Sequence, residues 1–122
     1  MKTTNFLSGV VSAMALLSGT GVGAIVGHAT YYTQQGVAGS CGVYHADMDY
    51  VVALGYPWGH NNHCGEKVRI WNPKTDRSVV ATVADTCPGC EQTKLDVSVG
   101  VYQYLVAGPA GSNPIDIVWD FI

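Results

Sequence analysis

Two aspartates and a threonine–tyrosine pair are the residues whose types and spacing could do chemistry. Strand alternation places Thr30 and Tyr32 on one face of a β-rich segment and Tyr31 on the other. Asp85 stands at the end of a strongly apolar strand pattern, and Asp96 follows a turn and precedes a helical pattern. Taken singly, these positions indicate a turn residue and a helix cap. Together the four residues predict a polar patch of hydroxyls and carboxylates, which suits sugar hydroxyls.

Aromatic side chains could complete such a carbohydrate site, because a flat aromatic face can stack on a sugar ring. Tyr31, Tyr44, Tyr56 and Trp58 lie in or near predicted loops, and Trp58 belongs to the rigid run Gly-Tyr-Pro-Trp-Gly. The alternative is that Trp58 packs down onto the body of the domain. Its proline and glycine neighbours favour a surface position, but they do not decide its function.

The elements that must position these residues are mostly strands. Alternating or β-rich patterns predict strands at 28–33, 49–54, 66–71, 78–84 and 115–122. The segment 97–107 has apolar residues at i, i+4 spacing, so we expect one short helix there, capped by Asp96 or Ser98 and ended by Gly108-Pro109. Many short strands with one helix in a chain of this size predict a mainly β fold, a small closed barrel without exposed edges.

The first 24 residues predict an export signal rather than part of the fold. Lys2 precedes an apolar run from about Phe6 to Leu17, and small residues then end at Ala24. The run is too short and too interrupted by glycine and serine for a membrane anchor. We therefore expect a secreted, extracellular protein, with a signal peptide at residues 1–24 and a single domain at residues 25–122.

Composition excludes several function classes. The 122 residues are 48% hydrophobic and 12% charged, which fits one compact domain and not a disordered chain. The formal net charge of −3 argues against a nucleic-acid partner. We also expect no membrane partner and a monomer.

The cysteines fit an oxidising compartment. The chain has an even number of them, which in a small exported protein indicates two disulfides. They are Cys41, Cys64, Cys87 and Cys90. Four cysteines permit three disulfide pairings, and their spacing does not select one. In a rival interpretation, Cys87-Pro-Gly-Cys90 is a redox pair or half of a zinc site, with His60, His63 and Cys64 as the other half. A redox pair needs a helix at its first cysteine, whereas Pro-Gly predicts a turn, so we expect no metal and no cofactor.

Six motifs occur in an order that resembles a known family. They are Gly27-x-Ala29-Thr30-Tyr31-Tyr32, Ser40-Cys41-Gly42, Val51-Val52-Ala53-Leu54, Cys64-Gly65, Val83-x-Asp85-x-Cys87-Pro88-Gly89-Cys90 and Leu95-Asp96-Val97-Ser98. Over residues 27–122 they are similar to the six-stranded double-psi β-barrel of expansins, rare lipoprotein A-like proteins, barwin-like proteins and family 45 endoglucanases. The short fungal expansin-like proteins of the loosenin type, which consist of this barrel alone, are the nearest likeness.

The resemblance implies a shallow polysaccharide groove across one end of the barrel. Asp96 matches the family's acid, and Thr30, Tyr32 and Asp85 match other groove residues. The resemblance also implies a Cys41–Cys64 disulfide and, with it, a Cys87–Cys90 pair.

Two departures from the family bear on function. Family 45 endoglucanases carry an aspartate base just after the Thr-x-Tyr motif, where this chain has Thr33-Gln34-Gln35. Asp47 or Asp49 could replace that base only if its loop folded over the groove. Expansins have an aromatic residue just after the Asp85 position, where this chain has Cys87, so Trp58 or Tyr31 would supply the stacking.

These observations predict an expansin-like protein that binds a cell-wall polysaccharide (cellulose, another β-glucan or chitin) and loosens it without hydrolysis. Asp96, in the position of the family's catalytic acid, would hydrogen-bond a glycosidic or hydroxyl oxygen with Asp85 supporting it. The residues in contact with the polysaccharide would be Thr30, Tyr32, Tyr31 and Trp58. The alternatives are a glycan-cleaving enzyme (a weak endoglucanase or a lytic transglycosylase) and a cysteine-protease inhibitor or secreted effector.

Overall fold

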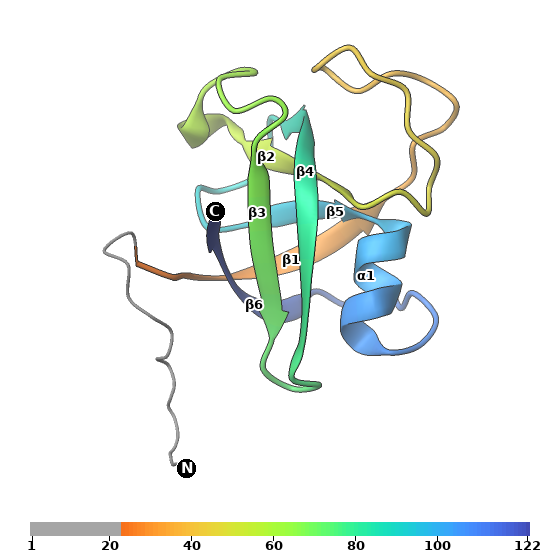
Figure 1. Ribbon diagram of the computed structural model, residues 1–122, viewed down its shortest axis with the longest axis vertical. Coiled ribbons are helices and arrows are strands. Elements are labelled where there is room, and N and C mark those ends of the chain that lie inside the picture. Colours follow the sequence, from red (N-terminus) through yellow and green to blue (C-terminus); the bar gives the residue numbers. More distant parts are fainter. Residues whose placement is uncertain (1–22) are drawn as a thin grey trace.

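The computed structural model describes residues 23–122, which form a closed barrel with one helix lying against it (Figure 1). The strands are β1 (Ile25–Tyr32), β2 (Val51–Gly55), β3 (Lys67–Asn72), β4 (Arg77–Cys87), β5 (Leu95–Ser98) and β6 (Ile115–Phe121), and the helix α1 spans Val99–Val106. The mainly β barrel predicted from the sequence is confirmed. The predicted signal peptide, apart from its last two residues, lies outside the described part of the chain.

The barrel interleaves strands from distant parts of the chain. Its order is β1-β5-β2-β4-β3-β6, with β1 beside β5 and β2 beside β4 in parallel and the other neighbours antiparallel. Closure leaves no strand with an unpaired edge. Within residues 23–122 the chain has no helix of the length and apolar character that a bilayer crossing needs.

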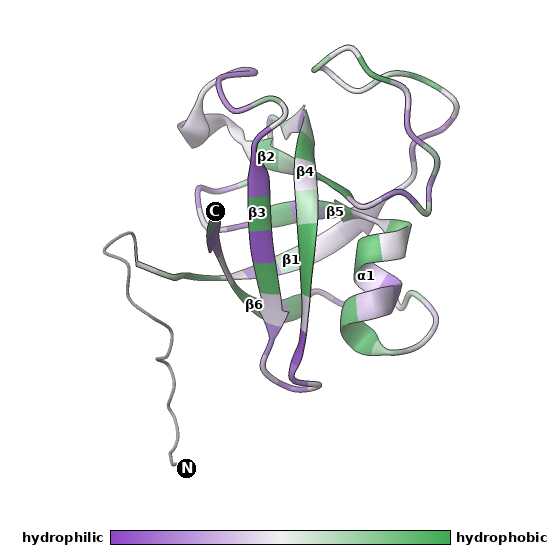
Figure 2. Ribbon diagram, viewed as in Figure 1, coloured by the Kyte–Doolittle hydropathy of each residue, from purple (hydrophilic) through white to green (hydrophobic). Residues whose placement is uncertain are grey.

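Alternation along the strands builds the core. In β3, Val68 and Ile70 are fully buried while Lys67 and Arg69 are exposed, and Figure 2 shows this strand changing colour from residue to residue. Trp119 is the largest fully buried side chain, and its indole Nε1 donates to the Thr93 carbonyl at 2.9 Å. The apolar faces therefore meet inside the barrel, and the polar residues are left for its outside and its ends.

The predicted helix was wrong at its start. Leu95–Ser98 forms strand β5, which pairs with β1 on one side and β2 on the other, so α1 begins only at Val99. Pairing on both sides outweighs the helical spacing of this segment. The Ser98 hydroxyl caps the helix by accepting from the Val101 amide at 3.3 Å, and Asp96 is therefore a strand residue rather than a cap.

Strand β4 is also longer than predicted. It continues to Cys87 because β2 pairs with it in parallel as far as Gly55. Asp85 therefore lies within a strand and not at its end. A register shift between Val52 and Ala53 sets Ala53 opposite Asp85.

The turn between β3 and β4 holds the C-terminal end of α1. Three side chains, which we call the helix-capping cluster, donate to its last carbonyls: Asn72 Nδ2 and Thr75 Oγ1 to Leu105 at 2.9 and 2.6 Å, and Arg77 Nε to Tyr104 at 2.6 Å. Helix C-termini leave carbonyls unpaired and favour a nearby cation. The cluster meets both needs and fixes α1 against the barrel.

Candidate functional site

The four polar residues singled out in the sequence lie on adjacent strands. Thr30 in β1 is the register partner of Asp96 in β5, Asp96 is opposite Ala53 in β2, and Ala53 is opposite Asp85 in β4. Thr30 Oγ1 donates to Asp96 Oδ1 at 3.1 Å. The residues Thr30, Tyr32, Asp85 and Asp96 are called the carboxylate cluster below.

The small residue Ala53 separates the two carboxylates. Directly opposite residues on neighbouring strands point to the same face, so Asp85 and Asp96 flank Ala53 on one face of the sheet. The next residues along these strands, Val52 and Val97, belong to the hydrophobic core. The carboxylate cluster therefore lies on the outer face of the barrel wall.

Burial and mutual repulsion set the protonation of this cluster. Burial raises the pKa of the Tyr32 hydroxyl to about 12, hydrogen bonding with the Gln34 side chain opposes that rise, and the negative charges of Asp85 and Asp96 add to it. Burial also raises the pKa of Asp96, against the hydrogen bond from Thr30 and the charge of Lys94, and Asp85 adds to the rise. Tyr32 is therefore a neutral hydroxyl at every physiological pH, and Asp96 takes up a proton more readily than a free aspartate.

Asp85 is held by the backbone around it. Its Oδ1 accepts from the backbone amides of Ser40 and Thr86, each at 2.8 Å. Gly39 makes the first contact feasible, because a Cβ there would stand 2.5 Å from the Ala84 carbonyl oxygen. The close approach fixes the 33–50 loop against β4 and orients the Asp85 carboxylate.

Two loops flank this part of the barrel and are joined covalently. The Cys41–Cys64 disulfide links the loop between β1 and β2 to the loop before β3, as the family resemblance implied. Beside it the Asn61 amide nitrogen donates to the Ser40 carbonyl at 3.0 Å, and the hydroxyls of Ser40 and Thr86 lie 2.6 and 3.2 Å from the Asn61 amide oxygen. These contacts form a polar rim next to Asp85.

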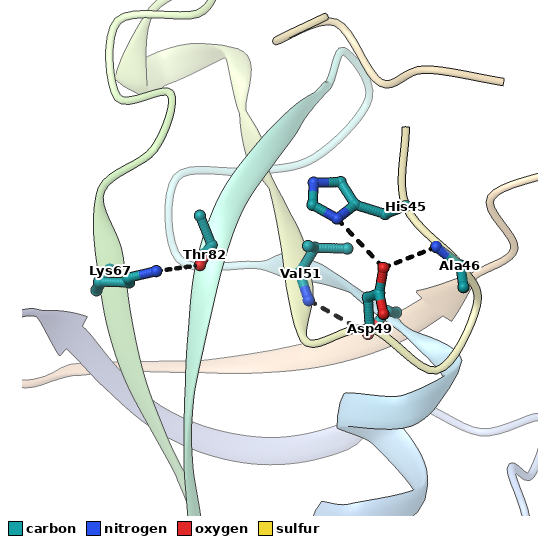
Figure 3. A network of polar contacts seen from close by, with 7 residues as sticks. His45, Ala46, Asp49, Val51, Lys67 and Thr82 are labelled. Atoms are coloured by element: carbon teal, nitrogen blue, oxygen red, sulfur yellow. Dashed lines mark hydrogen bonds and ion pairs between the residues drawn. The ribbon is translucent and has the colours of Figure 1, made fainter. Parts of the chain in front are cut away.

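Both carboxylates of the first loop stabilise the loop itself. Asp49 Oδ2 accepts from the Ala46 amide at 2.8 Å and lies 3.4 Å from His45 Nδ1, contacts that Figure 3 shows in one view. Asp47 Oδ1 accepts a hydrogen bond from the backbone amide of Gln34 at 2.6 Å. Each carboxylate therefore has a structural partner within its own loop.

The second disulfide adjoins Asp96. Cys87 and Cys90 are bonded to each other, which confirms the pairing that the family resemblance implied, and a turn rather than a helix joins them. Their sulfur atoms and a carboxylate oxygen of Asp96 lie within 4.8 Å of one another. Within the described residues all four cysteines are in disulfides, so none supplies a thiolate for the zinc or redox alternatives in this state.

The aromatic candidates lie apart from the carboxylates. Tyr31 faces inward, with its ring centroid 5.0 Å from that of Tyr102 in α1. The half-buried Trp58 packs edge-on against Phe121 at 5.2 Å and donates from Nε1 to the Gln92 carbonyl at 2.7 Å. Trp58 thus takes the alternative position predicted for it, down on the barrel, whereas Tyr44 is exposed.

Sequence reasoning missed one residue of this region as a candidate. Gln34 is only 6% exposed, and its side chain hydrogen-bonds with the Tyr32 hydroxyl, which is also buried. Gln34 belongs to a polar segment whose sequence predicts an exposed turn, so no local signal indicates its burial. The residue becomes buried only when the 33–50 loop folds.

A cavity of about 420 Å³ lies elsewhere, between the β3–β4 turn and the start of β6. Its lining includes Lys74, Val106, Pro114 and Asp116. Two of its polar lining residues, Asn72 and Thr75, are already paired with α1. We place the candidate site at the carboxylate cluster, where the polar residues singled out in the sequence lie together on adjacent strands.

Comparisons with known proteins agree with the fold. The expansin of Clavibacter michiganensis is 29% identical, with a TM-score of 0.66 over 81% of this chain and 50% of that chain. A mutant of the same expansin, crystallised in complex with cellohexaose, is 28% identical with the same TM-score and coverage. No protein-family model matches the chain. The chain has an expansin-like double-psi β-barrel.

Two further similar proteins are not expansins by name. Ripening-related protein 6 of Oryza sativa subsp. japonica is 37% identical over 75 residues, which are 57% of this chain and 45% of that protein. The Streptomyces papain inhibitor is 25% identical, with a TM-score of 0.64 over 83% of this chain and 96% of that chain. The chain thus spans about half the length of the expansin and of the rice protein, but nearly the whole of the inhibitor.

Proposed function

We propose that the chain is a secreted expansin-like protein that binds a neutral cell-wall β-glucan at the carboxylate cluster and loosens it without hydrolysis. The observation that carries this proposal is the likeness to an expansin whose mutant binds cellohexaose. The Thr30–Asp96 hydrogen bond, in a patch shared with Asp85 and Tyr32, adds the residue types that sugar hydroxyls need.

Each residue of the cluster has a separate role in this proposal. Asp96 accepts a hydrogen bond from a sugar hydroxyl, since the one hydrogen bond that it accepts within residues 23–122 comes from Thr30. Thr30 and Tyr32 orient the chain from β1. Asp85 is fixed by two backbone amides, and its electrostatic repulsion helps to raise the pKa of Asp96.

The contacts of the other candidate carboxylates support the proposed absence of hydrolysis. Inverting hydrolysis needs a general acid and a general base about 6.5–9.5 Å apart with room for water between them. Asp47 and Asp49 were the candidate replacements for the missing base, and each binds a backbone amide of its own loop region. Both carboxylates thus hold the fold of their own loop, which supports binding without hydrolysis.

The test replaces the central carboxylate. Asp96→Asn keeps an acceptor for Thr30 but removes the charge, and losing a charge-assisted hydrogen bond should weaken cellulose binding about tenfold. Binding to microcrystalline cellulose and the mechanical weakening of filter paper are measured together with released reducing sugars. Asp116→Asn, at an exposed carboxylate of β6, is the matched control and should leave all three unchanged.

Two outcomes would contradict the proposal. Full cellulose weakening by a folded Asp96→Asn variant would remove the role of Asp96. Soluble reducing sugars or anhydro-sugars from the wild type, abolished by Asp96→Asn, would favour the glycan-cleaving alternative.

One observation favours a second candidate, inhibition of a cysteine protease. The papain inhibitor is matched over nearly its whole length, and five of the large apolar side chains that are exposed here lie in the 33–50 loop. They are Val37, Val43, Tyr44, Met48 and Tyr50. Papain inhibition that survives Asp96→Asn but is lost in Tyr44→Ser would support this function, and no inhibition at micromolar protein would reject it.

A further inference from the structure

Tyr56 is a large aromatic side chain that the fold leaves exposed while it fixes the residues around it. Its side chain belongs to a residue that is 51% exposed, at the start of a short 3-10 helix, η2 (Tyr56–Trp58). Two positions on, Trp58 is anchored by its indole hydrogen bond and by Phe121. The Gly59 amide donates to the Tyr56 carbonyl at 2.7 Å. The chain after Tyr56 is therefore held against the barrel.

The chain before Tyr56 is held equally closely. Gly55, the last residue of β2, is the register partner of Cys87 in β4. A Cβ on Gly55 would stand 2.5 Å from the Cys90 carbonyl oxygen and 2.6 Å from that of Glu91. Only glycine allows β2 to approach this disulfide-bonded turn so closely. Tyr56 thus follows the strand at a point fixed on both sides, and little backbone freedom would be lost when a ligand binds there.

This fixed point lies at the end of the strand that carries the centre of the candidate site. Ala53 separates the two carboxylates, and Gly55 is two residues further along the same strand. Alternate residues of a strand share a face and lie about 7 Å apart. Tyr56 is therefore apart from Asp96 but within the span of one oligosaccharide that contacts both.

The ring of Tyr56 has a face to offer. Of the other aromatic candidates, Tyr31 faces inward and Trp58 packs down on the barrel. The Tyr56 ring meets the ring of His60 at 6.0 Å between centroids and at 79° between planes. Such an edge-on contact covers at most one face of the tyrosine ring. An exposed aromatic residue is common on protein surfaces; the rigid attachment beside the site is what distinguishes Tyr56.

We propose that the Tyr56 ring stacks on a sugar ring of the bound β-glucan, beside the sugar whose hydroxyl Asp96 accepts. This inference rests on the function proposed above, and it gives the stacking role to a residue outside the six sequence motifs. The hydroxyls of a β-linked glucose unit are equatorial, so its C–H groups form a flat apolar face that matches an aromatic ring. Asp96 then recognises the polar edge of the glucan chain, and Tyr56 recognises its face.

The test separates the ring from its hydroxyl. Tyr56→Ala should lower the affinity for cellohexaose, measured by calorimetry on the purified protein, about tenfold, as the loss of one aromatic stacking contact would give. Tyr56→Phe and Tyr56→Trp keep a ring and should bind within about twofold of the wild type. The melting temperature should change little in all three, because the side chain is exposed. Val26→Ala, at an exposed apolar residue near the start of β1, is the control and should change neither quantity.

A further variant keeps the test decisive. Tyr56→Gln replaces the ring by a polar side chain and should lose as much affinity as Tyr56→Ala, which carries the test if the alanine variant does not fold. An equal loss in Tyr56→Phe and Tyr56→Ala would assign the contact to the hydroxyl and overturn stacking.

The inference and the proposed function fail differently. If folded Tyr56→Ala and Tyr56→Gln bind cellohexaose like the wild type while Asp96→Asn binds it more weakly, the stacking role is overturned and the proposed function stands. No binding of cellohexaose or cellulose by the wild type would overturn both.

Discussion

Asn72 and Gln34 are both buried side-chain amides, at 4% and 6% exposure, but they lie in regions of different character. Asn72, in the helix-capping cluster, uses both ends of its amide: Nδ2 donates to the Leu105 carbonyl, and Oδ1 accepts from the Lys74 backbone, each at 2.9 Å. Gln34, beside the carboxylate cluster, contacts the Tyr32 hydroxyl, but its Nε2 makes no hydrogen bond of comparable geometry within the described residues. The same chemical group is fully paired in one region and less well paired in the other.

This difference distinguishes a buried amide that stabilises the fold from one that does not, and it requires no comparison with a related protein. A well-paired buried amide stabilises the fold, and a poorly paired one contributes less. We therefore expect substitutions near α1 to lower stability and spare binding, and substitutions at the carboxylate cluster to do the reverse. The predictions below run from the largest expected effect to the smallest.

The two disulfides should differ most in their effect on stability. Cys41→Ser with Cys64→Ser opens a loop of 23 residues, which should lower the free energy of unfolding by about 3 kcal/mol in the chain-entropy model. Cys87→Ser with Cys90→Ser opens a separation of only 3 residues and should lower it by about 1.5 kcal/mol. Urea unfolding of both double variants checks the order, and a larger loss from the Cys87–Cys90 pair would contradict it.

Asn72→Ala should expose the contrast between the two amides most directly. It removes two hydrogen bonds and leaves the turn backbone and the α1 carbonyl short of partners, so the free energy of unfolding should fall by about 2 kcal/mol. Cellohexaose affinity should stay within error at a temperature where the variant is folded. A variant as stable as the wild type would show that the helix-capping cluster adds nothing to the fold.

Ser98→Ala probes the third buried polar residue. Its hydroxyl accepts from the Val101 amide at 3.3 Å as the N-cap of α1 and from the Val51 amide at 3.4 Å across the sheet. Loss of an N-cap typically costs about 1 kcal/mol, and we expect that reduction in the free energy of unfolding. Ser98→Thr, which retains the acceptor, is the control. Equal losses in both variants would point to packing rather than capping.

Sequence patterns predicted the barrel and the grouping of Asp85 with Asp96, because strand alternation and the order of motifs can be read directly from the chain. They failed at β5, where four residues pair on both sides and Asp96 becomes a strand residue. They also failed at Gln34, which is buried in the folded loop and whose backbone amide bonds to the Asp47 side chain 13 residues away. Both errors concern contacts that form only once distant strands and loops have come together.

The smallest expected effect is the pH dependence that Asp96 gives to stability. Because burial and Asp85 raise its pKa in the folded protein above the usual 3.8, folding favours its protonated form. That contribution to stability is complete below the unfolded-state pKa and is lost as the pH rises through the folded-state pKa. Asp96→Asn has no such charge, so its stability relative to the wild type should increase from pH 3 to pH 7.

Urea unfolding of wild type and Asp96→Asn at several pH values measures this difference, in which the titration of all other groups largely cancels. The gain should be small because Asp96 is only about half buried and water screens the exposed part of its charge. Asp116→Asn controls for the loss of one negative charge at an exposed position. If Asp96→Asn instead became relatively less stable as the pH rises, the carboxylate would be stabilised rather than strained by its surroundings.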